Sequence, residues 1–244
     1  MSHVCSAELP NKALIPIAKD VYVCSPALCF ATMGCDLSPS GLIRLGFELC
    51  GSYSLPPSGI GAFASRPPLT NTEEIAALVS HMGGARGART AASALRHIID
   101  RSASPMETNC AMFYSLPLKK GGCSLSAPKM NHRINVPDGM RQLIGKGYFL
   151  CDLYWEKARL DVEYDSESHH ATRSERTSDA IRRNALSAMG VSVITLTADQ
   201  ILDFDLAWAS ALNISHMLHE RIRVAKNDPL HAQRKLHREL FGPK

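Results

Sequence analysis

The fold is decided by a stretch that reads YFLCDLYW (148–155), EKA (156–158) and RLDVEYD (159–165). The first segment is rich in aromatic residues, which favour β-strands. The third alternates apolar and polar residues with a period of two, as a strand with one buried face does. Because only a short turn separates these segments, the pattern predicts an antiparallel hairpin.

The segments around this hairpin predict a mixed sheet flanked by helices. The expected helices and strands are 104–116 (helix), 134–136 (strand), 178–189 (helix), 191–196 (strand), 199–224 (helix) and 230–240 (helix), with a polar loop over 166–176. On the helix over 178–189, the residues predicted to be buried are Ile181, Ala185, Ala188 and Met189, and those predicted to lie opposite are Asp179, Arg182 and Arg183.

The first hundred residues predict a separate α/β region. A strand over 21–24 is followed by helices over 27–33, 40–50, 72–81 and 89–100, with an irregular connection over 51–69. Ser25-Pro26 and Ser38-Pro39 are capping signals for the first two helices. We therefore expect three parts: an α/β region (1–101), a mixed-sheet domain (102–205) and a basic helical extension (206–244).

Composition excludes several classes of protein. The chain has 244 residues, of which 45% are hydrophobic and 20% charged, as in an ordinary folded domain rather than a disordered or fibrous chain. No run of roughly 18 apolar residues predicts a membrane span, and residues 1–20 lack a secretory signal pattern. We expect a cytoplasmic protein that is not associated with a membrane. The net charge of +4 is mildly basic.

The eight cysteines are scattered and form no C-x-x-C pair. We expect reduced thiols that pack as small hydrophobic groups. The alternative is that Cys24, Cys29, Cys35 and Cys50 converge on a metal ion.

Acidic residues of the predicted hairpin are the main functional signal. Asp152 lies on the first strand, and Glu163 and Asp165 share one face of the second. Carboxylates gathered on one face are costly unless a cation or a proton offsets them. Mg²⁺ prefers such oxygen ligands and assists phosphodiester hydrolysis. The alternative is that these acids face solvent, and Asp161 is expected at the rim of the face.

Other polar residues near the hairpin could complete a site. His169 could transfer a proton, and Arg182 and Arg183 could bind a phosphate. Glu107, on the helix over 104–116, is a further possible ligand. The alternatives are a solvated histidine loop and weak pairing of the arginines with Asp179 along their own helix.

Four ordered segments together resemble the restriction-endonuclease-like superfamily, in the branch of the very short patch repair endonucleases and their uncharacterised bacterial relatives. They are SPME (104–107), DLYW (152–155), VEYDSESH (162–169) and Asp179-x-x-Arg182-Arg183-Asn184-x-Leu186-x-x-x-Gly190-Val191-x-Val193. The resemblance spans residues 102–202 and implies a restriction-endonuclease-like core with an N-terminal α/β region and C-terminal helices.

The resemblance implies a Mg²⁺- or Mn²⁺-dependent DNA endonuclease. Asp152 and Glu163 would ligate the metal, together with Glu107 as the helix glutamate. Arg182 would face the phosphate. The usual lysine two residues after the second acid is replaced by Asp165. Asp165 or His169 would then accept the proton of the water, since the repair branch relies partly on histidine.

The N-terminal region resembles the C-terminal region of AbiEi-type antitoxin and regulator proteins, through SPALCF (25–30) and LGFELCGSY (45–53). Two hypotheses follow. The first is a metal-dependent DNA endonuclease in repair or defence. The second is a non-catalytic regulatory or antitoxin-like protein that uses the nuclease fold to bind nucleic acid or a protein of a toxin–antitoxin or defence system. Basic residues over 221–244 could contact phosphates in either case.

Overall fold

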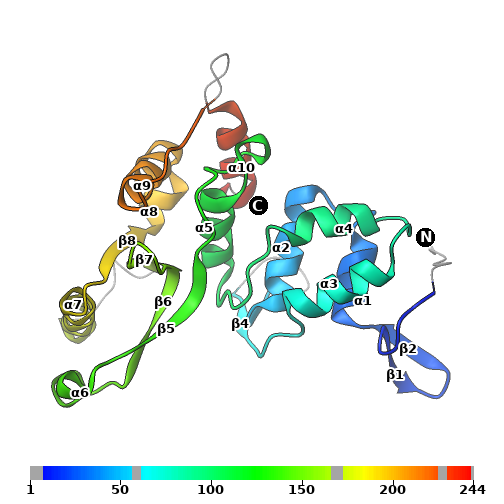
Figure 1. The fold of residues 1–244 in the computed structure, drawn as a ribbon, viewed down its shortest axis with the longest axis horizontal. Helices are drawn as coiled ribbons and strands as arrows, with labels where there is room; N and C mark the ends of the chain where they lie inside the picture. The colour runs from blue at the N-terminus through cyan, green and yellow to red at the C-terminus, as the bar shows by residue number, and fades with distance from the viewer. Residues whose placement is uncertain (1–7, 57–61, 166–172, 225–229, 243–244) are drawn as a thin grey trace. The chain divides into compact units, whose positions relative to one another are not determined.

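A computed structural model describes residues 8–56, 62–165, 173–224 and 230–242 (Figure 1). The chain divides into two compact units, Met1–Thr108 and Asn109–Lys244, and the division falls within helix α5 (Pro105–Ser115). None of the described helices is long and apolar enough to cross a membrane.

The described residues of the first unit form two antiparallel strand pairs and four complete helices. Its elements are β1 (Leu14–Ala18), β2 (Val21–Cys24), α1 (Pro26–Met33), α2 (Pro39–Cys50), β3 (Tyr53–Ser54), β4 (Ala64–Ser65), α3 (Thr72–His81) and α4 (Ala88–Leu95). The hydroxyls of Ser25 and Ser38 cap α1 and α2 by accepting backbone N–H groups at 3.2 and 3.1 Å. These two capping signals therefore act as the sequence predicts.

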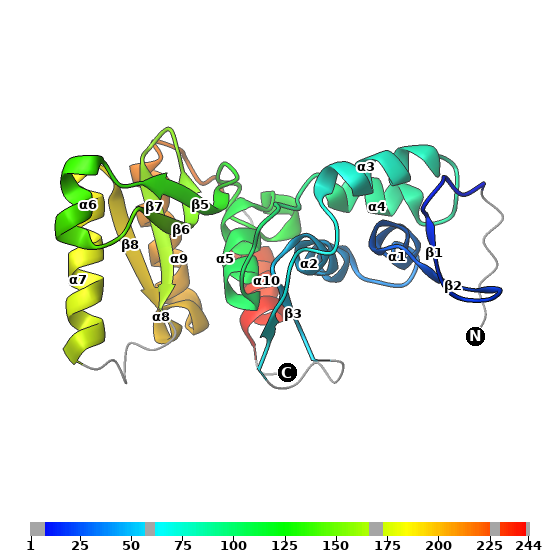
Figure 2. The same cartoon turned by 90° about the horizontal axis from the view of Figure 1, so that it is seen from below.

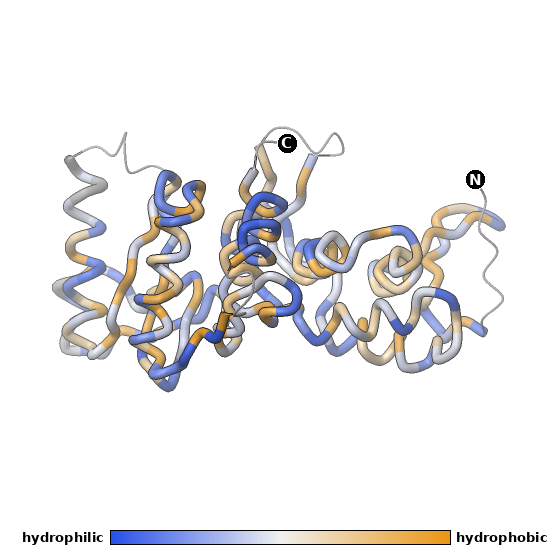
Figure 3. Tube along the Cα trace, turned by 90° about the horizontal axis from the view of Figure 1, so that it is seen from above, coloured by the Kyte–Doolittle hydropathy of each residue, from blue (hydrophilic) through white to orange (hydrophobic). Residues whose placement is uncertain are grey.

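Helix α4 is shorter than the predicted helix over 89–100. The carboxylate of Asp100 accepts hydrogen bonds from the backbone and hydroxyl of Thr72, at 3.0 and 2.9 Å. This contact ties the segment after α4 to the start of α3, so the helix ends at Leu95. Strand β1 was not predicted. It pairs with β2 in an apolar hairpin (orange near the N-terminus in Figure 3), in which Ile17 is 62% exposed.

The second unit is built on a four-stranded mixed sheet. After α5 its elements are η1 (Leu118–Lys120), β5 (Lys129–Asn135), α6 (Asp138–Ile144), β6 (Tyr148–Trp155), β7 (Leu160–Asp165), α7 (Arg173–Ala188), β8 (Ser192–Thr197), α8 (Ala198–Leu202), α9 (Phe204–Met217) and α10 (His231–Phe241). The strand order is β5-β6-β7-β8, and β7 and β8 are parallel while the other neighbours are antiparallel. The α/β class and the mixed sheet are confirmed.

Helices cover both faces of this sheet. Figure 2 shows α6 and α7 on one side, and α5 and α9 on the other. On the α7 side, Phe149, Cys151 and Leu186 belong to one buried cluster. Around α5, the ring of Phe113 contacts the rings of Phe204 and His237, with centroids 6.5 and 5.6 Å apart. The sheet is thus packed on both faces.

Three predicted elements of this unit have different bounds. Strand β5 begins at Lys129 rather than 134, and α7 begins at Arg173, so residues 173–176 are helical and not loop. The predicted helix over 199–224 is broken into α8 and α9. The carboxylate of Asp203 accepts the backbone N–H groups of Asp205 and Leu206, both at 2.9 Å, and so starts a second helix.

The buried side of α7 also differs from the prediction. Ile181 and Ala188 are exposed, whereas Ala185 and Leu186 are buried. Arg182, which was predicted on the outer side, turns toward the sheet with a side chain that is 22% exposed. In this orientation, Arg182 pairs with Glu163 of β7.

Candidate active site

Asp152 lies where the regular pairing of β6 and β7 ends. The register pairs Tyr154 with Asp161 and Leu153 with Val162. If the register continued, Asp152 would pair with Glu163. At that point, however, the carboxylate of Asp152 accepts a hydrogen bond from the backbone N–H of Tyr164, at 3.1 Å. The two predicted ligands therefore come from neighbouring strands, at the same end of their pair.

Glu163 is held by Arg182 of α7. Oε1 of Glu163 accepts hydrogen bonds from Nε of Arg182, at 2.8 Å, and from Nη2, which also donates to the backbone carbonyl of Leu150. The guanidinium lies over the ring of Phe149, 5.2 Å from its centroid. Burial acts to lower the pKa of Arg182, but the hydrogen bond and charge of Glu163 outweigh it and raise that pKa. Arg182 is therefore a fixed cation facing the acids.

Asp161 is buried in the same place and is not at the rim, so that prediction was wrong. Its side chain is 0% exposed, and neither carboxylate oxygen has a hydrogen-bond donor among the described residues. Nη2 of Arg182 lies 3.9 Å from Oδ2 of Asp161, which is too long for a hydrogen bond. Burial, then the charge of Glu163, raises the pKa of Asp161 to about 9. Asp161 is therefore protonated at neutral pH.

The three acids Asp152, Asp161 and Glu163 are electrostatic neighbours. The charges of Glu163 and Asp152 both contribute to the raised pKa of Asp161. In β7, Asp165 continues the face of Asp161 and Glu163 and is half-buried at the end of the strand. Within the described ranges, however, no group of three or more His, Cys, Asp or Glu side chains is spaced to hold a metal ion. The described cysteines form no such group either, and Cys50 and Cys151 are buried free thiols.

Glu107 has a structural role at the start of α5. Its carboxylate accepts the backbone N–H of Ala103 at 2.9 Å, and its own N–H donates to the hydroxyl of Ser104 at 3.1 Å. This reciprocal pattern resembles a capping box. Glu107 belongs to the first unit, whereas the acids of the hairpin belong to the second. Arg183 is exposed on α7, and His169 and His170 lie outside the described residues.

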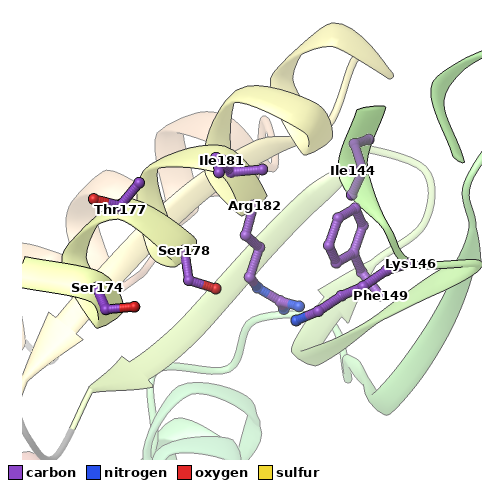
Figure 4. Close-up of a pocket in the computed structure, with 8 residues that line it drawn as sticks. All are labelled: Ile144, Lys146, Phe149, Ser174, Thr177, Ser178, Ile181 and Arg182. Carbon is purple, nitrogen blue, oxygen red and sulfur yellow. The ribbon is translucent and has the colours of Figure 1, made fainter. Parts of the chain in front are cut away.

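A pocket opens beside Arg182, between α7 and the connection from α6 to β6 (Figure 4). Its volume is about 580 Å³. Its polar lining residues are Lys146, Ser174, Thr177, Ser178 and Arg182, and Phe149 is part of its apolar wall. Of these, only Arg182 was predicted as a site residue. A sequence signal did exist for Lys146, which lies between two glycines at the predicted strand entrance.

Comparison with protein-family models, with curated proteins and with solved structures found no match for this chain.

Proposed function

We propose that this protein is a metal-dependent endonuclease that hydrolyses phosphodiester bonds in DNA, in repair or defence. One observation carries the proposal: Asp152 and Glu163 meet at one end of the β6–β7 pair, within the order α5-β5-β6-β7-α7-β8. This arrangement agrees with the restriction-endonuclease-like superfamily that residues 102–202 resemble. Because a fold hosts many functions, the argument rests on the acids rather than on the fold.

The acids fit a Mg²⁺ or Mn²⁺ ion as a site of two protein carboxylates. Mg²⁺ at phosphate-handling sites commonly uses one or two carboxylates, and water and substrate supply the other ligands. Asp152 and Glu163 would hold the ion, which would polarise the phosphate and lower the pKa of the attacking water.

Arg182 positions the acid that this proposal needs. Both of its hydrogen bonds to Glu163 end on Oε1, which leaves Oε2 as the oxygen for a cation. The same guanidinium lies at the mouth of the pocket, where it could also stabilise charge on a phosphate. Asp165 stands where the superfamily has lysine, so proton transfer from the water would fall to Asp165 or to His169.

The alternative is a non-catalytic, antitoxin-like protein that uses the same fold to bind nucleic acid or a protein partner. The ion pair between Arg182 and Glu163 favours it, because the guanidinium already neutralises the second ligand. The replacement of the motif lysine by Asp165 favours it as well.

DNA cleavage separates these two functions. Plasmid, linear and single-stranded DNA would be incubated with Mg²⁺ or Mn²⁺ and the wild type, Glu163→Gln or the control Glu156→Gln. Glu156 is an exposed acid in the β6–β7 turn, paired with Lys129. We expect cleavage by the wild type and the control, and none by Glu163→Gln. Equal cleavage by all three proteins would refute the site. If none of the three cleaved DNA and none bound the metal, the alternative function would be favoured.

A further inference from the structure

We propose that the pocket beside Arg182 binds one nucleotide of a single DNA strand, with its phosphate between Lys146 and Arg182 and its base against the apolar side of the pocket at Ile181. This inference rests on the proposed function and names the part of the substrate that the site recognises. It is carried by the charge of the pocket, by the chemistry of its walls and by its position next to the acids.

The charge of the pocket suits an anion. Lys146 is exposed, and it has no ion-pair partner among the residues that the structure describes. Figure 4 shows the nitrogen ends of Lys146 and Arg182 directed toward each other, and none of the described residues that line the pocket is acidic. Glu163 balances the charge of Arg182, so Lys146 provides the excess positive charge. A phosphate between the two cations would remove their mutual repulsion.

The walls of the pocket suit a base. Ile144 and Ile181 line the apolar side of the pocket, and the exposed Ile181 gains cover from any ligand seated there. A flat base seated against this side would bury its own apolar face together with that of Ile181. Opposite this apolar part, α7 presents the hydroxyls of Ser174, Thr177 and Ser178, which are spaced to lie on one side of the helix. These hydroxyls can donate hydrogen bonds to a base or sugar and accept hydrogen bonds from it.

The position of the pocket favours a strand of the substrate over an unrelated ligand. Arg182 lines the pocket and also holds Glu163, so a nucleotide seated there lies next to the carboxylates. The volume of about 580 Å³ is within the usual range for a site that encloses a small ligand. A nucleotide anchored in the pocket would thereby fix the neighbouring phosphodiester relative to Asp152 and Glu163.

Binding of a fluorescein-labelled single-stranded oligodeoxynucleotide, measured by anisotropy in a chelator and at several salt concentrations, tests this proposal without any metal or cleavage. The variants are Lys146→Ala and the control Lys157→Ala, an exposed lysine of the β6–β7 turn that carries the same charge. We expect Lys146→Ala to weaken binding and to reduce the slope of log K against log salt by about 0.7, the value for one phosphate contact on a single strand. Lys157→Ala should keep the wild-type slope.

Ser178→Glu gives a second test, because it places an acid in the pocket on the exposed side of a helix. We expect roughly tenfold weaker binding, from repulsion of the phosphate, with an unchanged thermal unfolding curve. If the wild type binds no oligodeoxynucleotide, the pocket proposal is overturned. If the wild type binds and both pocket variants bind equally well, the pocket is also excluded, whereas cleavage that depends on Glu163 would still support the proposed nuclease.

Discussion

Strand β7 has two buried faces with opposite chemistry. On one face, Leu160 and Val162 are completely buried, and Leu153 of β6 lies directly opposite Val162. On the other face, Asp161 is equally buried and Glu163 is 18% exposed, and both lie near Arg182. The backbone register that buries two apolar side chains therefore also buries two acids.

The two faces of β7 contribute differently to the stability of the fold. Each buried apolar side chain contributes about 1.5 to 3 kcal/mol to folding. Buried acids oppose folding unless they are paired or protonated, and replacing buried ion pairs by apolar groups is often neutral or stabilising. A buried titratable group that lowers folding stability and lies in a cleft is a candidate functional residue. We therefore assign stability to the face of Leu160 and chemistry to the face of Glu163.

The largest expected effect comes from removing the cation of the acidic face. Arg182→Met leaves the largely buried carboxylate of Glu163 without its positive partner, so the free energy of unfolding should fall by about 3 to 5 kcal/mol. Arg183→Met, at the exposed neighbouring position, should change it by less than about 0.5 kcal/mol. Urea unfolding of both variants checks this. Similar stabilities for the two would mean that Arg182 does not compensate the acids.

On the apolar face, Leu160→Ala should lower the free energy of unfolding by about 3 kcal/mol, because it removes buried methyl groups and leaves a cavity. Its effect should be the same at every pH, since no titratable group is involved. Chemical denaturation at acidic and neutral pH measures this. A strong dependence on pH would show that the two faces are not independent.

Asp161→Asn should stabilise the protein increasingly as pH rises. The pKa of Asp161 is raised from its ordinary value of 3.8 to about 9 in the folded state. Between these values the folded chain keeps a proton that the unfolded chain has lost, so the stability of the wild type falls with rising pH over that window. Asparagine has no such dependence. Between about pH 5 and about pH 8, the advantage of the variant should grow by at least about 1 kcal/mol. A constant difference would contradict a protonated Asp161.

The smallest effect concerns an acid that belongs to neither face. Glu107→Ala should lower the free energy of unfolding by about 1 kcal/mol, since it removes a capping contact of α5. It should leave the affinity for Mn²⁺ unchanged. Thermal unfolding and metal titration of the same preparation test both statements. Lost metal binding with unchanged stability would restore Glu107 as a ligand.

Local patterns predicted most of the fold. The alternation in 159–165, the aromatic segment 148–155 and the Ser-Pro caps of α1 and α2 are signals contained in a few neighbouring residues, and each element formed where expected. The shortened α4 and the division of α8 from α9 depend on side chains that accept backbone hydrogen bonds, namely Asp100 and Asp203. Such competition is not visible in apolar periodicity.

The site was only partly predictable, because its key contacts join distant residues. Period-two alternation indicated that Asp161, Glu163 and Asp165 share a face, but it also suggested that this face meets solvent. The side chain of Arg182 comes from 19 residues beyond Glu163 and buries that face. On α7, Arg182 faces the sheet while Ile181 is exposed, and both line the pocket together with Lys146. None of this follows from the hydrophobic pattern of α7 alone.

Calorimetric titration of Mn²⁺ into the wild type, Asp152→Asn and the control Asp138→Asn tests most directly whether the acidic face is a metal site. Asp138 is an exposed acid of α6 that pairs with Arg141. We expect one binding site in the wild type and in Asp138→Asn, and its loss in Asp152→Asn with the thermal unfolding curve preserved. Binding of equal strength in all three proteins, or in none, would contradict this expectation.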